Sequence, residues 1–166
     1  MKLNDGDQYF WKVSEYKMHC LCPILIAFAL VGYSYGATKT KCQVVQALRN
    51  QNVPDSDLRD WLCLVKHESN YKYDAEGTNS DSKDYGIFQM NSKYSCGNPK
   101  GTSSSICWRV NTFGCADSCT SFKNADISND ANCAVRVKNC AGFSRWYGWK
   151  DHCSNVQGSE YDYSSC

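Results

Sequence analysis

An α+β fold is predicted for this chain of 166 residues by three observations. Several segments carry apolar residues three and four positions apart, which is the spacing of one helical face. A short run with high β propensity follows a polar loop, and this order is typical of a small antiparallel sheet. Cysteines are spread from Cys42 to Cys166, so disulfides could hold the intervening loops. We therefore expect a mainly helical domain interrupted by a small sheet.

Two consecutive helices are predicted in the first half of the chain. The first covers Cys42 to Leu48, and the stretch from Asn50 to Pro54 ends it. The next three residues, 55–57, are all good N-caps for a second helix. Extending the apolar stripe of that helix by three positions leads to Glu68, so a carboxylate is expected on the core-facing side near the helix end. The stripe consists of Leu58, Trp61, Leu62 and Val65.

A small hairpin is predicted next. The segment Glu76 to Lys83 is rich in turn-forming residues, and Asp84 to Asn91 follows it as a β-prone run. The stretch from Cys96 to Cys119 has no sustained period, so we expect a loop held by disulfides.

Two more helices are predicted near the C-terminus. Asp126 or Ser128 begins a third helix that continues through Val137, and the segment Arg145 to His152 forms a shorter, aromatic helix.

The N-terminal segment is expected to be removed on secretion. The apolar run Leu21 to Val31 is too short for an ordinary transmembrane helix and is followed by small residues up to Gly36, as in a signal peptide. Acidic residues before it suggest that translation begins at Met18 instead of Met1, and an uncleaved signal anchor is the alternative. We expect an N-terminal extension and signal peptide over residues 1–36 and one domain over 37–166.

Charge and cysteine content narrow the function classes. Lys and Arg number 18 against 17 Asp and Glu, so no broad basic field is available for nucleic acid or an anionic membrane. The cysteines are irregularly spaced and accompanied by three His, which favours disulfides in an oxidising compartment over zinc ligation. We expect a secreted, extracellular monomer without metal or cofactor and without stable membrane association after processing.

Two carboxylates stand out as candidates for chemistry. Glu68 lies on an apolar helical stripe, whereas Asp84 begins a strand 16 residues later. A carboxyl in an apolar setting keeps its proton and can donate it, while one in a polar setting stays ionised and can stabilise a developing cation. Glycosidic cleavage needs this asymmetry. The alternative is that Glu68 is a solvated surface group and Asp84 a turn residue.

Three motifs resemble those of the c-type lysozymes. HESNY (His67 to Tyr71) and DYGIFQMNS (Asp84 to Ser92) are similar to the two catalytic segments of that family. RWYGWKDHC (Arg145 to Cys153) is similar to its tryptophan-bearing helix. The resemblance covers Cys42 to Cys166 and implies a lysozyme-like fold with a cleft between the helical domain and the sheet subdomain.

The resemblance also implies roles for individual residues. Glu68 would be the general acid, and Asp84 the nucleophile or ion-pair stabiliser of a retaining mechanism. Trp146 would pack beside the glutamate and keep its surroundings apolar, with plain core packing as the alternative. The other substrate-binding residues that it implies are Asn79, Gln89 and Asn91.

Disulfides are implied by the same alignment. Cys107 and Cys140 are left over, and we expect them to form a fifth bridge; two free thiols or an intermolecular bridge are the alternatives. The four implied pairs are Cys42–Cys166, Cys63–Cys153, Cys96–Cys119 and Cys115–Cys133.

The sequence departs from the family in its sugar-stacking residues. Just before Cys96 the family usually has aromatic residues that stack on sugar faces, whereas this chain has Tyr94 and Ser95. Trp108 could replace the missing aromatic, or it is an exposed loop tryptophan without that role. The shortened turn around Asn79 leaves the position of that side chain open.

The function that the resemblance to the c-type lysozymes implies is that of a glycoside hydrolase that cleaves β-1,4 bonds between N-acetylmuramic acid and N-acetylglucosamine in bacterial peptidoglycan. Its partner would be that polysaccharide or a chito-oligosaccharide. The alternative is a non-catalytic, lysozyme-like carbohydrate-recognition protein. Such relatives commonly lose one carboxylate of the pair, and the presence of both Glu68 and Asp84 favours the bacteriolytic enzyme.

Overall fold

A computed structural model of the chain describes residues 37–96, 115 and 118–166. It confirms the α+β class. Short 3-10 turns occupy Asp55–Asp57 (η1), Cys119–Lys123 (η2) and Phe143–Arg145 (η3). The helices are α2 (Lys41–Arg49), α3 (Leu58–Ser69), α5 (Ser128–Ala141) and α6 (Tyr147–His152), and the strands are β1 (Glu76–Thr78), β2 (Lys83–Tyr85) and β3 (Met90–Asn91).

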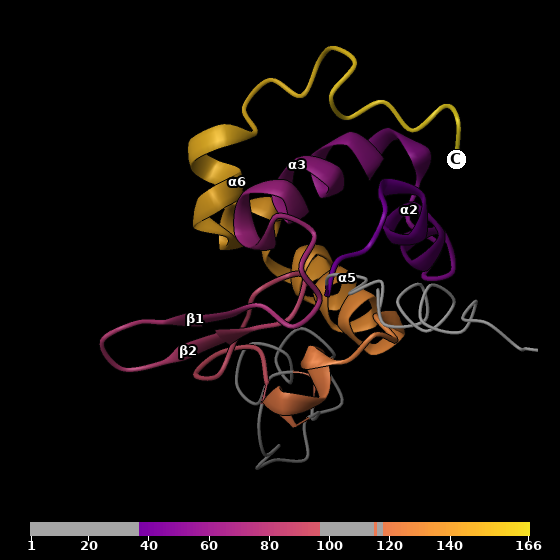
Figure 1. The fold of residues 1–166 in the computed structure, drawn as a ribbon. Helices are drawn as coiled ribbons and strands as arrows, with labels where there is room; N and C mark the ends of the chain where they lie inside the picture. The colour runs from indigo at the N-terminus through magenta and orange to yellow at the C-terminus, as the bar shows by residue number, and fades with distance from the viewer. Residues whose placement is uncertain (1–36, 97–114, 116–117) are drawn as a thin grey trace, which may run out of the picture. The chain divides into compact units, whose positions relative to one another are not determined.

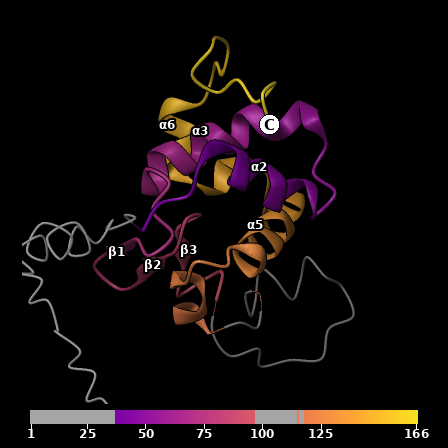
Figure 2. The same ribbon diagram turned by 45° about the vertical axis from the view of Figure 1, so that its right-hand side comes forward.

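The helices gather in one lobe, from which the β1–β2 hairpin extends (Figure 1). Helix α3 packs against α6 and α2, and α5 packs against α2. Figure 2 shows β3 beside β2, in an antiparallel sheet of order β1-β2-β3. The segment after α6 passes over α3 and ends near α2, where Cys42 and Cys166 form a disulfide.

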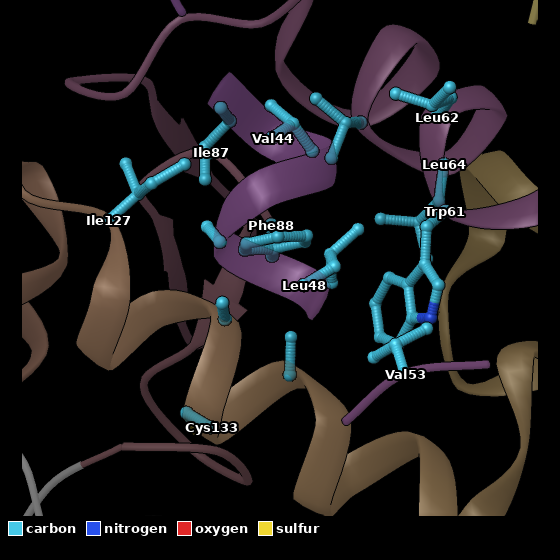
Figure 3. Packing of buried hydrophobic residues seen from close by; sticks show 14 of the residues in the cluster. Val44, Leu48, Val53, Trp61, Leu62, Leu64, Ile87, Phe88, Ile127 and Cys133 are labelled. Atoms are coloured by element: carbon cyan, nitrogen blue, oxygen red, sulfur yellow. The ribbon is translucent and has the colours of Figure 1, made fainter. Parts of the chain in front are cut away.

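The hydrophobic core joins the sheet to the helices. Ile87 and Phe88, from the turn after β2, are fully buried, and Figure 3 shows Phe88 beside Leu48 of α2. The ring of Trp61, from α3, meets that of Phe88 edge to face at 5.6 Å between centroids. Such an aromatic pair contributes about 1 kcal/mol beyond the area that it buries. The strand that carries Asp84 is thereby anchored to the helix that carries Glu68.

The prediction of one continuous β-prone run over Asp84 to Asn91 is wrong in detail. The run is split by a turn at Gly86 to Gln89, where both end residues have positive φ (76° and 48°). Ile87 and Phe88 leave the sheet at this turn to fill the core, so their apolar character reflects core burial and not strand pairing. The polar segment Glu76–Thr78, expected as a loop, is the partner strand.

The predicted caps of the second helix act differently from expectation. Residues 55–57 form the turn η1, and Asp57 makes no capping hydrogen bond. Asp57 instead pairs with Lys138 of α5 at 2.5 Å. Thr40, a cap not predicted from the sequence, forms a full capping box with Gln43 at the start of α2.

The start of each of the two later helices is set by the residues just before it. Helix α5 starts at Ser128. The N–H of Ser128 donates a hydrogen bond to Oδ1 of Asp126 at 3.0 Å. The aromatic helix starts at Tyr147, two residues later than expected, because residues 143–145 form η3.

Disulfides tie these elements together. Cys140 is disulfide-bonded, but its predicted partner Cys107 lies outside the described residues, so their pairing stays a prediction. The bridges Cys42–Cys166, Cys63–Cys153, Cys96–Cys119 and Cys115–Cys133 are present, and these are the pairs that the resemblance implies.

Other predictions also fall outside the described ranges, namely the signal peptide with its apolar run Leu21 to Val31, and Trp108. Across the part of the chain that the structure describes, no helix is both long enough and apolar enough to cross a membrane.

Candidate active site

Glu68 lies in the last turn of α3 and is partly buried. Its position follows from the apolar stripe, since Trp61, Leu62 and Val65 on the preceding turns are completely buried. Burial raises the pKa of Glu68, and repulsion from Asp84 raises it further, while a hydrogen bond from the backbone of Gly148 opposes the shift. Glu68 is therefore a carboxyl that keeps its proton more readily than an exposed glutamate.

Gly148, in α6, brings its backbone against the Glu68 carboxyl. Its N–H donates to Oε1 of Glu68 at 2.8 Å. A Cβ at this position would lie 2.7 Å from the same oxygen, so a larger residue would displace the carboxyl. Gly148 was not anticipated from the sequence, in which the only signal is a glycine between Tyr147 and Trp149 in an aromatic helix.

Asp84 lies at the centre of the three-stranded sheet. It pairs with Gly77 on β1 and with Asn91 on β3. Directly opposed residues place their side chains on one face, which brings the Asn91 amide to the carboxylate. Asn91 Nδ2 donates to Oδ1 at 2.6 Å, and Asn79 Nδ2 donates to Oδ2 at 2.8 Å.

Ser82 holds the two asparagines in place. Its Oγ accepts hydrogen bonds from Asn91 Nδ2 at 3.0 Å and from Asn79 Nδ2 at 3.3 Å. The position of Asn79, which the sequence left open, is thus beside Asp84. Because an ionised carboxylate only accepts hydrogen bonds, two amide donors suit the charged form of Asp84.

The two carboxyl groups therefore occupy opposite environments. Glu68 is flanked by core and by one backbone donor, whereas Asp84 lies in a polar network on the sheet. A glycosidic oxygen placed between them could take a proton from the first, while the second would stabilise the cation that forms on the sugar. Among the described residues, no three His, Cys, Asp or Glu side chains gather in a way that could hold a metal ion.

Trp146, the residue just before α6, is buried. It is 5% exposed, and its indole N–H donates to the carbonyl of Phe88 at 2.8 Å. Its ring also meets that of Trp61 at 5.8 Å between centroids. These contacts join α6 to both α3 and the turn after β2; that Trp146 also shields Glu68 stays a prediction.

Gln89 occupies the left-handed end of the turn before β3. Its Nε2 donates to the carbonyl of Gly86 at 2.8 Å. Its Oε1 would lie 3.0 Å from a Cβ added to Gly77, the residue opposite Asp84. The side chain therefore lies along the sheet near Asp84, and sugar binding by it stays a prediction.

Tyr94 is the exposed aromatic residue expected after β3. It is 45% exposed, and the guanidinium of Arg145 lies over its ring, 4.7 Å from the centroid. Ser95 is buried and supplies no part of a platform. The contact with Arg145 was not anticipated from the sequence.

His67 and His152 are both exposed. Their rings are stacked at 4.2 Å between centroids, and His67 Nε2 lies 3.3 Å from the hydroxyl of Tyr161. Burial lowers the pKa of His67, and repulsion from His152 lowers it further. The histidines therefore link α3 to α6 beside Glu68 without belonging to the carboxylate pair.

A separate cavity of about 240 Å³ contains neither carboxylate of the pair. It offers ammonium and phenol groups, and no pair of carboxylates that could divide the acid and base work of glycosidic cleavage. It is lined by Lys39, Lys41, Lys66, Tyr71, Glu160 and Tyr161.

Comparisons with known proteins agree with this geometry. The sequence model of the C-type lysozyme/alpha-lactalbumin family matches residues 37–166. A protein from Bombyx mori named Lysozyme is 40% identical over 146 residues, which cover 86% of this chain and 98% of the relative. A Galleria mellonella Lysozyme is 38% identical over 71% of this chain and 92% of the relative. The tracheal isozyme of Lysozyme C from Bos taurus is 35% identical over 76% and 84%.

Proposed function

The chain belongs to the C-type lysozyme/alpha-lactalbumin family, and on that premise we propose that it is a lysozyme that cleaves the β-1,4 bonds between N-acetylmuramic acid and N-acetylglucosamine in bacterial peptidoglycan. The observation that carries this proposal is the contrast between a half-buried Glu68, whose pKa is raised, and an Asp84 held by two amide donors. The family name alone does not decide the matter, because the family also contains the alpha-lactalbumins.

In this mechanism Glu68 protonates the leaving glycosidic oxygen. Asp84 attacks the sugar carbon or stabilises its positive charge, and Glu68 then takes a proton from the incoming water, so that the configuration is retained. This division of roles is the one established for lysozymes. The hydrogen bonds from Asn79 and Asn91 fix the carboxylate of Asp84 and leave little freedom for it to turn away.

Carbohydrate recognition without turnover is the competing function. The exposed Tyr94 and the buried Ser95 support it, because they leave an incomplete aromatic platform. The intact carboxylate pair and its polar network favour the enzyme, since recognition alone does not require a desolvated acid opposite an ionised one.

We also place the protein outside the cell, as a monomer. Four disulfides among the described residues suit an oxidising compartment. The test of the whole proposal is a clearing assay with oxidised protein on bacterial cell walls, followed by analysis of the new reducing ends. New muramic acid ends support the proposal, and binding to the walls without any new ends would establish the recognition protein instead.

A further inference from the structure

Two tyrosines near residues of the site are widely exposed: Tyr94, which follows β3, and Tyr147, which precedes Gly148 in α6. Tyr94 is 45% and Tyr147 76% exposed, and in the described part of the chain they are the large hydrophobic residues most open to solvent. Both carry a cation over the ring: Arg145 over Tyr94, and Lys150 over Tyr147. Exposed aromatic rings beside a glycosidase site are suited to stacking on sugars. Stacking on a sugar does not require a cation over the ring, so the cations call for a separate explanation.

The Arg145–Tyr94 contact joins the two sides of the site. Tyr94 follows β3, whose Asn91 holds Asp84. Arg145 ends η3, three residues before Gly148, whose N–H holds Glu68. A ligand group bound at this contact would therefore belong to the same glycan chain that passes the two carboxylates.

Among the described residues, Arg145 has no acidic side chain as an ion-pair partner. Across the described ranges, no Asp or Glu oxygen lies within 4.0 Å of its guanidinium. Lys93, the other cation over the Tyr94 ring, forms an ion pair with Asp81. Arg49, which lies over Tyr163, likewise pairs with Asp55.

We propose that Arg145, stacked on Tyr94, binds a carboxylate of the glycan and gives the site a preference for carboxylated peptidoglycan over neutral chitin chains. This inference rests on the proposed glycosidase function. The guanidinium presents paired N–H donors that match a carboxylate, and its stacking on the ring fixes their plane. Muramic acid carries a carboxylate on its lactyl group where that group is free, or on the peptide where the lactyl carboxyl is amide-bonded to one, whereas chitin carries none.

The test compares soluble peptidoglycan fragments with the same fragments after their carboxyl groups are amidated, and with N-acetylglucosamine hexamer. In the wild type, kcat/KM should be highest for the carboxylated fragments. The variant Arg145→Gln should lower the ratio of kcat/KM for carboxylated over amidated fragments about three- to tenfold, mainly through KM. Arg145→Lys keeps the charge without the planar donors and should restore part of the ratio. The preference should shrink at high salt, because the carboxylate contact is exposed.

Arg49→Gln is the matched control, because it also removes an arginine from a tyrosine ring and changes the net charge equally. It should leave the ratio at the wild-type value. If Arg145→Gln keeps the wild-type ratio, or if Arg49→Gln lowers it equally, the carboxylate site is refuted while the glycosidase stands. If the wild type hydrolyses none of the three substrates, the proposed function itself fails.

Discussion

The backbone N–H of Gly148 donates to the carboxyl of Glu68 at 2.8 Å, although 80 residues separate them in the sequence. The contact makes α6 part of the acid's environment, together with the helix on which Glu68 lies. Because Gly148 has no side chain, α6 approaches close enough to exclude water from one side of the carboxyl. Burial raises the pKa of Glu68, and the hydrogen bond from Gly148 opposes that rise without cancelling it.

Glu68→Gln should abolish hydrolysis while keeping the fold. Glutamine has the same shape and can still accept the Gly148 hydrogen bond, but it has no transferable proton. Loss of a general acid costs about 100- to 10,000-fold in rate, so kcat should fall by at least about 100-fold. The measurement is hydrolysis of N-acetylglucosamine hexamer, with binding of the oligosaccharide followed by calorimetry. Glu160→Gln, the same substitution at an exposed position, should keep full turnover. If Glu68→Gln keeps its turnover, Glu68 is not the general acid.

Asp84→Asn should lower turnover without unfolding the protein. The side chain is in a polar network on the sheet and not in the core, so its neutralisation costs little stability. We expect kcat to fall about 100-fold or more, since the charge that would meet the sugar cation is lost. Thermal unfolding and kinetics measured on the same preparation check this. Asp81→Asn removes an equal charge three residues away and should keep activity; a fall in Tm parallel to activity would instead make Asp84 a structural residue.

The sequence allowed Glu68 and Asp84 to be identified because local patterns mark them. The stripe of α3 ends on Glu68, and Asp84 opens a motif that is similar to a known one. The contacts of Gly148 and Arg145 were not predictable, because each depends on two segments that pack together from distant parts of the chain. Residue patterns report which face is buried but not which backbone atom meets a given side chain.

The turn after β2 shows the same limit for the fold. The apolar residues Ile87 and Phe88 predict a strand, because both types are common in strands. In the folded chain their side chains are instead buried in the core. The glycine before them was visible in the sequence, but its left-handed conformation and its close neighbours were not.

Gly86→Ala should therefore be strongly destabilising. Its φ is +76°, and an added Cβ would lie 2.1 Å from the carbonyl oxygen of Phe122, a backbone atom that cannot move without shifting η2. Strain and overlap together should cost at least about 2 kcal/mol. Gly158→Ala provides the control, because φ there is +96° and nothing lies within 4 Å. Chemical denaturation should show a clearly larger loss at Gly86; equal losses would mean that backbone conformation alone matters.

The predicted bridge between Cys107 and Cys140 can be tested by peptide mapping under non-reducing conditions. Linking these residues closes a loop of roughly thirty residues, for which chain entropy gives a few kcal/mol of stabilisation. Changing both to Ser should lower Tm and weaken binding of long oligosaccharides more than short ones, since the other disulfides still hold the fold. A free thiol at either position, or a different partner, would refute the pairing.

The raised pKa of Glu68 also predicts how stability depends on pH. A carboxyl whose pKa is higher in the folded than in the unfolded chain binds its proton more tightly when folded, so stability falls as pH rises from the unfolded value, near 4.5, through the folded value. Above that window the charged, partly buried carboxylate destabilises the fold. Glu68→Gln removes this penalty and should raise Tm by roughly a few degrees at pH 7, while at pH 3, where Glu68 is protonated in both states, the two proteins should unfold together.

Thermal unfolding of the wild type and Glu68→Gln between pH 3 and pH 8 measures the difference directly. His67 has the opposite effect on stability. Its pKa is lowered in the folded protein, so stability is lost as pH falls below about 6.5. The plot of Tm against pH for each protein therefore contains both effects. Only the difference between the two proteins isolates Glu68. A gap that is constant across the range, or one that widens towards acid, would show that the carboxyl of Glu68 is not held in its protonated form by burial between α3 and α6.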